Sequence, residues 1–259
     1  EKERLALGWT DGFRLVQRMA ANARYFSDSS TKIPLDVADG NAVAGMCVDY
    51  YGAAFAHQVN RPDNVRLIWT APAGGTTVSG DPIGVLRGAP EQELAQAFVE
   101  FVLSPAGQAL WSSPVGAPNG PRERELFRPP VRRDTYATLP PERAAQSPYV
   151  GTDHLQYRPE LTAASFGTIR RAVRVMCIDT HEELKEAWAE IIKAGMPADA
   201  LAVMGDVSAL PYRAGGEGDP GLESRDALVS ARRMTELGAI FRENYRRAAE
   251  LARQHQEKR

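Results

Sequence analysis

Nine prolines between residues 113 and 160 constrain the fold of this 259-residue chain more than any other feature. Proline lacks a backbone N–H group and has a fixed φ, so a proline-rich segment cannot form a long helix or a central strand. We therefore expect residues 121–160 to form an irregular proline-rich arm between two regions of regular structure. The prolines are Pro114, Pro118, Pro121, Pro129, Pro130, Pro140, Pro141, Pro148 and Pro159.

The composition narrows the class of protein. Hydrophobic residues make up 43% of the chain, which is enough for the core of one or two domains. The formal net charge of -2 gives no basic surface for nucleic acid, so no nucleic-acid partner is expected. No apolar stretch reaches the roughly 20 residues of a transmembrane helix. The charged start at residues 1–4 does not resemble a signal peptide.

Three long helices are predicted from apolar residues that recur at steps of three and four. They cover residues 8–26, 91–103 and about 224–254. The second ends at Ser104-Pro105, which is typical of an N-cap and first-turn proline of another short helix. A capping box at residues 180–183 predicts a further helix. The helical spacing also places four aromatic residues in the core, namely Phe98, Phe101, Trp111 and Trp188.

Short apolar runs predict strands at residues 46–49, 65–71 and 83–86. Strands that alternate with helices indicate an α/β protein.

Two adjacent tyrosines, Tyr50 and Tyr51, follow the first of these expected strands. Side chains of neighbouring residues in a strand point to opposite faces, so both rings can meet one ligand only where the backbone bends into a helix. The free N–H groups of a helix start suit an anion, while phenolates coordinate hard cations such as Fe(III). We interpret Tyr50 and Tyr51 as ligand contacts and metal ligands, with Asp49 as a direct or supporting acceptor. Packing tyrosines are the alternative.

The chain contains two cysteines, Cys47 and Cys177, each after an apolar run. Free cysteine is among the most buried residue types, which favours two buried thiols, although a single disulfide is consistent with an oxidising compartment. Metal-ligand spacings of cysteine and histidine are absent from the sequence.

The order of these segments resembles the extracellular solute-binding proteins of ABC importers, particularly their ferric-ion-binding branch. The most specific motif is a phenylalanine-rich helix followed by Leu103-Ser104-Pro105-Ala106-Gly107-Gln108. The resemblance covers roughly residues 8 to 115. It implies an α/β, periplasmic-binding-protein type II-like fold, as an incomplete two-lobe clamp with an extended helical C-terminal region.

Under this resemblance, residues 1–75 are the remainder of the second lobe and carry the tyrosine pair. Residues 76–120 are the crossover and part of the first lobe, and residues 161–259 are a helical region that packs on the first lobe. The resemblance also places Thr76, Thr77 and Ser79 near the ligand. The opening strands of the first lobe have no counterpart in this chain.

The function implied is a non-enzymatic, periplasmic or extracellular solute-binding component that delivers its ligand to an ABC permease, after removal of a signal peptide. Fe(III), as transported ligand rather than catalytic cofactor, or a ferric complex is the expected solute. A binder of an oxyanion or small organic anion is the first alternative. An α/β enzyme or sensor domain that shares the fold is the second. No cofactor is expected for catalysis.

Overall fold

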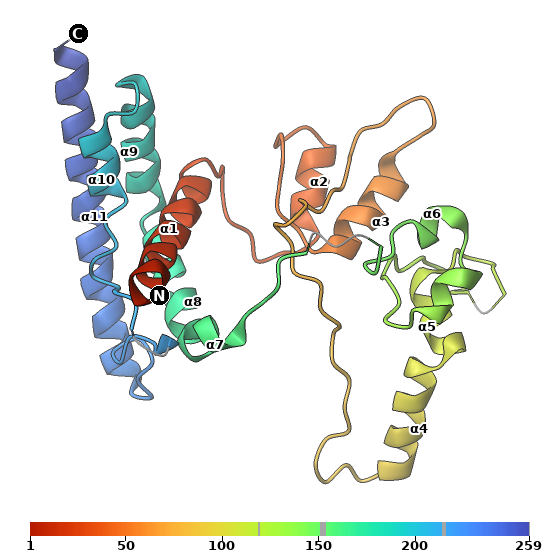
Figure 1. Cartoon of the computed structure of the whole chain (residues 1–259). Coiled ribbons are helices and arrows are strands. Elements are labelled where there is room, and N and C mark those ends of the chain that lie inside the picture. The colour runs from red at the N-terminus through yellow and green to blue at the C-terminus, as the bar shows by residue number, and fades with distance from the viewer. Residues whose placement is uncertain (119, 151–153, 214–215, 259) are drawn as a thin grey trace. The chain divides into compact units, whose positions relative to one another are not determined.

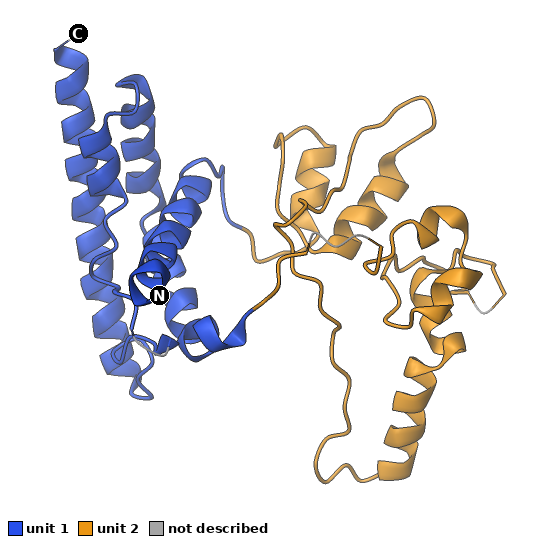
Figure 2. Ribbon diagram, in the orientation of Figure 1, with its two compact units in different colours: residues 1–26, 158–259 blue, residues 27–157 orange. Residues whose placement is uncertain are grey.

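The chain folds as two compact units in a computed structural model that describes residues 1–118, 120–150, 154–213 and 216–258. Unit 1 combines residues 1–26 with residues 158–259, and unit 2 comprises residues 27–157 (Figures 1 and 2). Unit 1 is therefore assembled from both ends of the chain. The division into lobes at residues 75, 120 and 160 stays a prediction.

Helices make up almost all of the regular structure in both units (Figure 1). Unit 1 contains α1 (Lys2–Ala21), α7 (Pro159–Thr162), η2 (Ala163–Ser165), α8 (Phe166–Val173), the π-helical turn η3 (Arg174–Ile178), α9 (His181–Lys193), α10 (Ala198–Met204) and α11 (Ala227–Glu257). Unit 2 contains α2 (Lys32–Ala38), α3 (Asp49–Val59), α4 (Gln92–Leu103), α5 (Pro105–Ser112), η1 (Asp134–Thr138) and α6 (Pro141–Ala144).

The expected α/β fold is wrong for this structure. Residues 46–48, 65–71 and 83–86 are irregular, and the one β feature among the described residues is an isolated bridge between Arg61 and Asn64. A strand is stabilised by hydrogen bonds to a neighbouring strand, and these short runs have no such neighbour in the described chain. Apolar runs of four to seven residues therefore remain extended or irregular, and no two-lobe α/β clamp forms.

The core of unit 1 lies between α1, α9, α10, α11 and the turn η3. The long helix α11 supplies a buried stripe that includes Leu237, Phe241 and Tyr245. Spacings of three and four residues put these side chains on one helix face, as the sequence predicted. Opposite them, Leu184 and Ile191 of α9 are fully buried.

Tyr245 joins this core to a buried polar network. Its hydroxyl donates to the carbonyl of Met176 in η3 at 2.8 Å and accepts from Gln17 Nε2 at 3.1 Å. Gln17 also donates to the carbonyl of Met204 at 3.2 Å. These bonds connect α1, α10 and α11 to the π-helical turn and satisfy polar groups that are buried there.

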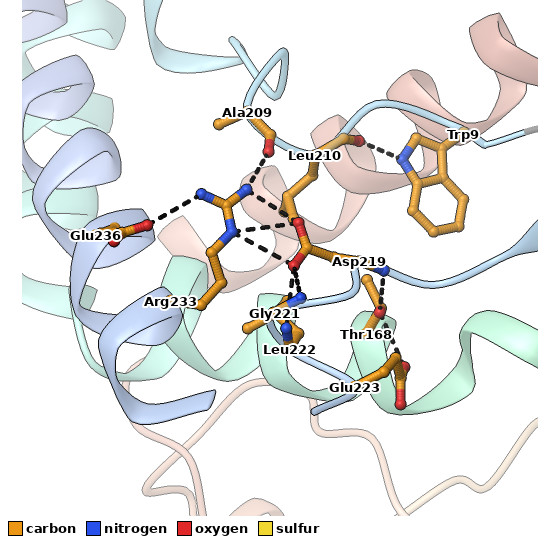
Figure 3. A network of polar contacts seen from close by, with 10 residues as sticks. All are labelled: Trp9, Thr168, Ala209, Leu210, Asp219, Gly221, Leu222, Glu223, Arg233 and Glu236. Carbon is orange, nitrogen blue, oxygen red and sulfur yellow. Dashed lines mark hydrogen bonds and ion pairs between the residues drawn. The ribbon is translucent and has the colours of Figure 1, made fainter. Parts of the chain in front are cut away.

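A second polar network secures the loop before α11 (Figure 3). Asp219 is 7% exposed and receives hydrogen bonds from Arg233 Nη2 at 3.0 Å and Nε at 3.2 Å. Its Oδ1 also accepts from the backbone N–H groups of Gly221 and Leu222. Arg233 in turn donates to the carbonyl of Ala209 at 2.9 Å.

The predicted ends are correct for α4 and for the start of α5, whereas the helix expected at residues 8–26 is α1 (Lys2–Ala21) and the one expected at about 224–254 is α11 (Ala227–Glu257). The helix expected at residues 91–103 is α4 (Gln92–Leu103), and Ser104 caps α5 by accepting a hydrogen bond from Gly107 N at 3.1 Å. The capping box at Thr180 does not form. Its hydroxyl instead donates to the carbonyls of Val175 and Met176, since the preceding π-helical turn presents them.

The core assignment of the four aromatics is wrong for α4. Phe98 is 59% and Phe101 is 49% exposed, because none of the residues of α4 is buried and this helix contacts mainly α5. Trp111 and Trp188 are half-buried. Helical spacing identifies an apolar face but not whether another element covers it.

Every helix in the described ranges is too short or too polar to span a membrane. Both cysteines are free thiols there, Cys177 buried in unit 1 and Cys47 half-buried in unit 2.

Candidate functional site

The tyrosine pair lies in the first turn of α3. Val48 has an extended backbone with φ -68° and ψ 141°, and Asp49 is the first helical residue. The bend that the sequence required is therefore present, although no strand precedes it. The ring centroids of Tyr50 and Tyr51 are 4.2 Å apart with an interplanar angle of 37°, so the two phenols do meet.

Gly52 fixes where this turn can lie. A Cβ atom at this position would come within 2.0 Å of Trp69 Cδ1, because the indole packs directly against the glycine backbone. The side chain of Asn60 at the other end of α3 holds the same segment, since its Oδ1 accepts from Leu67 N at 3.0 Å. Residues 66–69 thus act as a support for α3 without pairing as a strand.

Arg128, from the proline-rich arm, completes the site. Its guanidinium carbon lies 4.0 Å from the centre of the Tyr50 ring and 5.7 Å from that of Trp111. The same guanidinium donates to Asp81 Oδ2 at 2.6 Å. A cation over an aromatic face is attracted by the ring quadrupole. Together with the hydrogen bond to Asp81, these contacts join Arg128 to three other segments of unit 2. We refer to Tyr50, Tyr51, Arg128 and Asp81 as the tyrosine–arginine cluster.

The two phenols are electrostatically unequal. Hydrogen bonds from Tyr51 and then from Arg128 lower the pKa of Tyr50, because both stabilise its phenolate form. The pKa of Tyr51 is raised, first because its hydroxyl donates to Tyr50 and also because a charge on Tyr50 would repel a second phenolate. Tyr50 is therefore the phenol of this pair that ionises more readily.

The cluster and the helix start beside it contain three kinds of hydrogen-bond donor. They are the guanidinium of Arg128, the phenol hydroxyls and the N–H groups of the first turn of α3, whose first two lack a partner within the helix. Asp81 is the opposing acceptor, and its side chain is 81% exposed. Exposed ion pairs contribute little to stability, so an incoming anion could replace Asp81 at small cost.

Of the other residues predicted for the site, Asp49 lies beside the tyrosines, whereas Thr76, Thr77 and Ser79 make no described contact with them. Asp49 is exposed at the start of α3, where its charge suits the helix dipole. In the structure described, no hydrogen bond or ring contact joins Thr76, Thr77 or Ser79 to the tyrosines. The carbonyl of Thr76 accepts from Leu155 N at 3.0 Å, while the side chains of Thr77 and Ser79 are exposed. Their role in binding stays a prediction.

A second cation–aromatic contact lies within the arm, next to the far end of α3. Arg143 is 5% exposed, pairs with Glu125 and has its guanidinium carbon 3.8 Å from the centre of the Phe127 ring. His57 of α3 lies 4.9 Å from the same ring, centroid to centroid. Phe127, through His57, and Arg128, through Tyr50, therefore attach the arm at both ends of α3.

Sequence reasoning missed Arg128 and Asp81. Arg128 is one of several arginines in the arm, and neither spacing nor neighbours distinguish it from Arg132 or Arg133. The contact depends on how an irregular segment folds back, which periodicity does not encode.

A metal site of three or more histidine, cysteine, aspartate or glutamate side chains is absent from the described ranges. Tyrosine oxygens remain as hard ligands for a cation such as Fe(III).

Comparison with known proteins agrees with a binding role. Residues 4–122 match the family of bacterial extracellular solute-binding proteins. The match includes all of the cluster except Arg128, and it supports solute binding for this part of the chain. It confirms the expected periplasmic or extracellular location, while the absence of enzymatic activity stays a prediction.

The chain is also similar to the putrescine/agmatine-binding protein of Pseudomonas aeruginosa, with 28% identity over 139 residues. The aligned part is 49% of this chain and 37% of that relative, so the chain spans well under half of the relative's length. No solved structure matches the chain significantly.

Proposed function

We propose that this chain is part of the extracellular solute-binding component of an ABC importer and that its solute presents an anionic oxygen group to the tyrosine–arginine cluster. The family match of residues 4–122 supports the solute-binding role. An ABC permease in the membrane is then its partner.

The position of Arg128 is the observation that favours an anionic group on the solute. Its guanidinium lies on Tyr50 and is one-third exposed, so it remains accessible beside the phenols. A guanidinium recognises carboxylate or phosphate oxygens through paired hydrogen bonds, and phenol hydroxyls add single donors. A cationic group placed at the same point would be repelled by Arg128.

Ferric iron is the second candidate solute, either as Fe(III) or as a ferric complex. The lowered pKa of Tyr50 favours this candidate, because a phenol must lose its proton to coordinate iron. An anion held by Arg128 could then share the metal, since both would meet the same pair of hydroxyls. Putrescine and agmatine, named in the description of the relative, are cations and fit this cluster least well.

Isothermal titration calorimetry of the full chain with phosphate, citrate, ferric citrate and putrescine tests these candidates. Tyr50→Phe removes one hydroxyl and keeps the ring, while Arg128→Gln removes the charge. Tyr149 and Arg133 form a matched control in the same unit, because the Arg133 guanidinium carbon also lies 4.5 Å from the centre of a tyrosine ring.

We expect phosphate or citrate to bind, and Tyr50→Phe to weaken that binding about two- to tenfold through one lost hydrogen bond. Arg128→Gln should weaken it further, while Tyr149→Phe and Arg133→Gln should have no effect. Ferric loading should give a visible phenolate-to-iron charge-transfer band that Tyr50→Phe bleaches or shifts. Equal losses in the control and test variants would contradict the proposed site. Binding of putrescine alone would contradict the anionic assignment.

A further inference from the structure

Unit 1 contains a cavity of about 430 Å³ that is open to solvent. Helix α1 forms one wall, and α7, α8 and the segment around Tyr212 form the others. Cavities of this size are typical of small-molecule sites. All lining residues belong to unit 1, whereas the tyrosine–arginine cluster belongs to unit 2. The apolar and aromatic part of the lining includes Trp9, Phe13, Val16, Ile169, Val173 and Tyr212.

Two glycines keep this cavity open. Gly8 and Gly12 lie one helical turn apart on α1, and both line the cavity. A Cβ atom at either position would meet no atom within 4 Å, so neither packing nor positive φ requires glycine there. Glycine is unfavourable inside a helix relative to alanine. The space that these glycines leave is therefore available to a bound molecule that lies against the helix.

The aromatic wall is held in place before any ligand arrives. Trp9 Nε1 donates to the carbonyl of Leu210 at 2.7 Å, and Arg233 secures the adjacent carbonyl of Ala209 (Figure 3). The rings of Trp9 and Phe13 meet edge to face with centroids 5.0 Å apart, and the Tyr212 ring lies 5.8 Å from Trp9. Such a surface offers ring contacts to an aromatic ligand without side-chain rearrangement.

Arg4 provides the charge of the site. It is the one charged residue among the lining residues, and its guanidinium side chain is 75% exposed. It pairs with Glu1, which lies one turn away and is 62% exposed, so this ion pair is weak and exchangeable. The indole N–H of Trp9 is already used, which leaves Arg4 as the strong donor.

We infer that this cavity binds a small carboxylate with an aromatic body. The ring lies in the apolar cavity against α1, and the carboxylate replaces Glu1 as the partner of Arg4.

Calorimetric titration of the full chain with naphthoate and its uncharged analogue naphthamide tests this inference. Gly12→Leu fills the cavity from a position where an added Cβ meets no atom within 4 Å, so the helix backbone has room for the new side chain and folding should be retained. Gly84→Leu is the matched control, since Gly84 of unit 2 also has no atom within 4 Å of an added Cβ. Arg4→Gln removes the charge and keeps most of the length.

We expect one naphthoate per chain, at least about tenfold weaker binding in Gly12→Leu and no change in Gly84→Leu. Naphthamide should bind about threefold more weakly than naphthoate, and Arg4→Gln should abolish that difference. Absence of naphthoate binding, or unchanged affinity in Gly12→Leu with the fold retained by circular dichroism, would overturn the site. Equal affinities of the wild-type chain for the two probes would overturn the carboxylate assignment.

Discussion

Replacement of Asp219 by asparagine should destabilise unit 1 by about 2 to 3 kcal/mol at neutral pH. The new side chain would still accept from Gly221 and Leu222 through Oδ1, but its amide NH2 would face the Nε and Nη2 donors of Arg233. Loss of one partner from a fully buried ion pair costs about 3 to 5 kcal/mol. The expected cost is smaller because Arg233 is 24% exposed and keeps Ala209 and Glu236 as acceptors.

Hydrogen exchange followed by mass spectrometry measures this effect in unit 1 alone. Peptides from the buried stripe of α11 should exchange about 30- to 150-fold faster in Asp219→Asn, whereas peptides from α3 should not change. Asp206→Asn is the control, because Asp206 is exposed, accepts a hydrogen bond from Ser208 N and pairs with no arginine among the described residues. Unchanged exchange in α11, or an equal effect of Asp206→Asn, would refute the role of the Asp219–Arg233 pair.

The pH dependence of the same pair has a definite sign. Burial raises the pKa of the Asp219 carboxyl, but hydrogen bonds from Arg233, Leu222 and Gly221 outweigh burial and lower the pKa from its ordinary 3.8. A group with a lowered folded pKa contributes its full stability above its unfolded pKa and loses it as pH falls through the folded pKa. The difference between wild type and Asp219→Asn should therefore be constant near neutral pH and shrink below pH 3.8.

Three further outcomes follow from burial and close packing. Phe241→Ala, which empties a fully buried position, should cost about 3 to 5 kcal/mol, whereas Phe98→Ala on the exposed face of α4 should cost less than about 1 kcal/mol, both by denaturant unfolding. Iodoacetamide should label Cys47 before Cys177, since burial raises the pKa of Cys177 to about 12 and makes its side chain inaccessible. Faster labelling of Cys177 would contradict its burial in the core of unit 1. Gly52→Ala should displace the indole packed on it and change tryptophan fluorescence, and an unchanged spectrum would contradict that contact.

Helices of this chain were predictable where their pattern is local. The buried stripe of α11 and the Ser104 cap of α5 depend on residues a few positions apart, and both were found from spacing. The strand predictions failed, because an apolar run such as residues 65–71 becomes a strand only beside a partner strand. The prediction that Phe98 is buried failed for a related reason, since a helix pattern shows which face is apolar but not what covers it.

In the candidate site, too, local features were predictable from the sequence and long-range contacts were not. The helix start at the tyrosines was predictable, although the strand expected before it is absent from the described structure. The approach of Arg128 depends on the path of the proline-rich arm, for which sequence periodicity gives no signal. The cavity in unit 1 likewise requires α1 to pack beside helices from the opposite end of the chain.

Construction of unit 1 from both ends of the chain has a consequence for synthesis on the ribosome. His181 of α9 bonds to the carbonyl of Ala20, 161 residues earlier. At about 5 to 20 residues per second, α1 must wait roughly 10 to 30 s for its partner helices to be made. During that interval Trp9 and Phe13 have no core to enter, so the nascent chain should expose α1 to proteases and to chaperones. Protection of α1 in ribosome-bound chains stalled before α9 would show that another segment shields it.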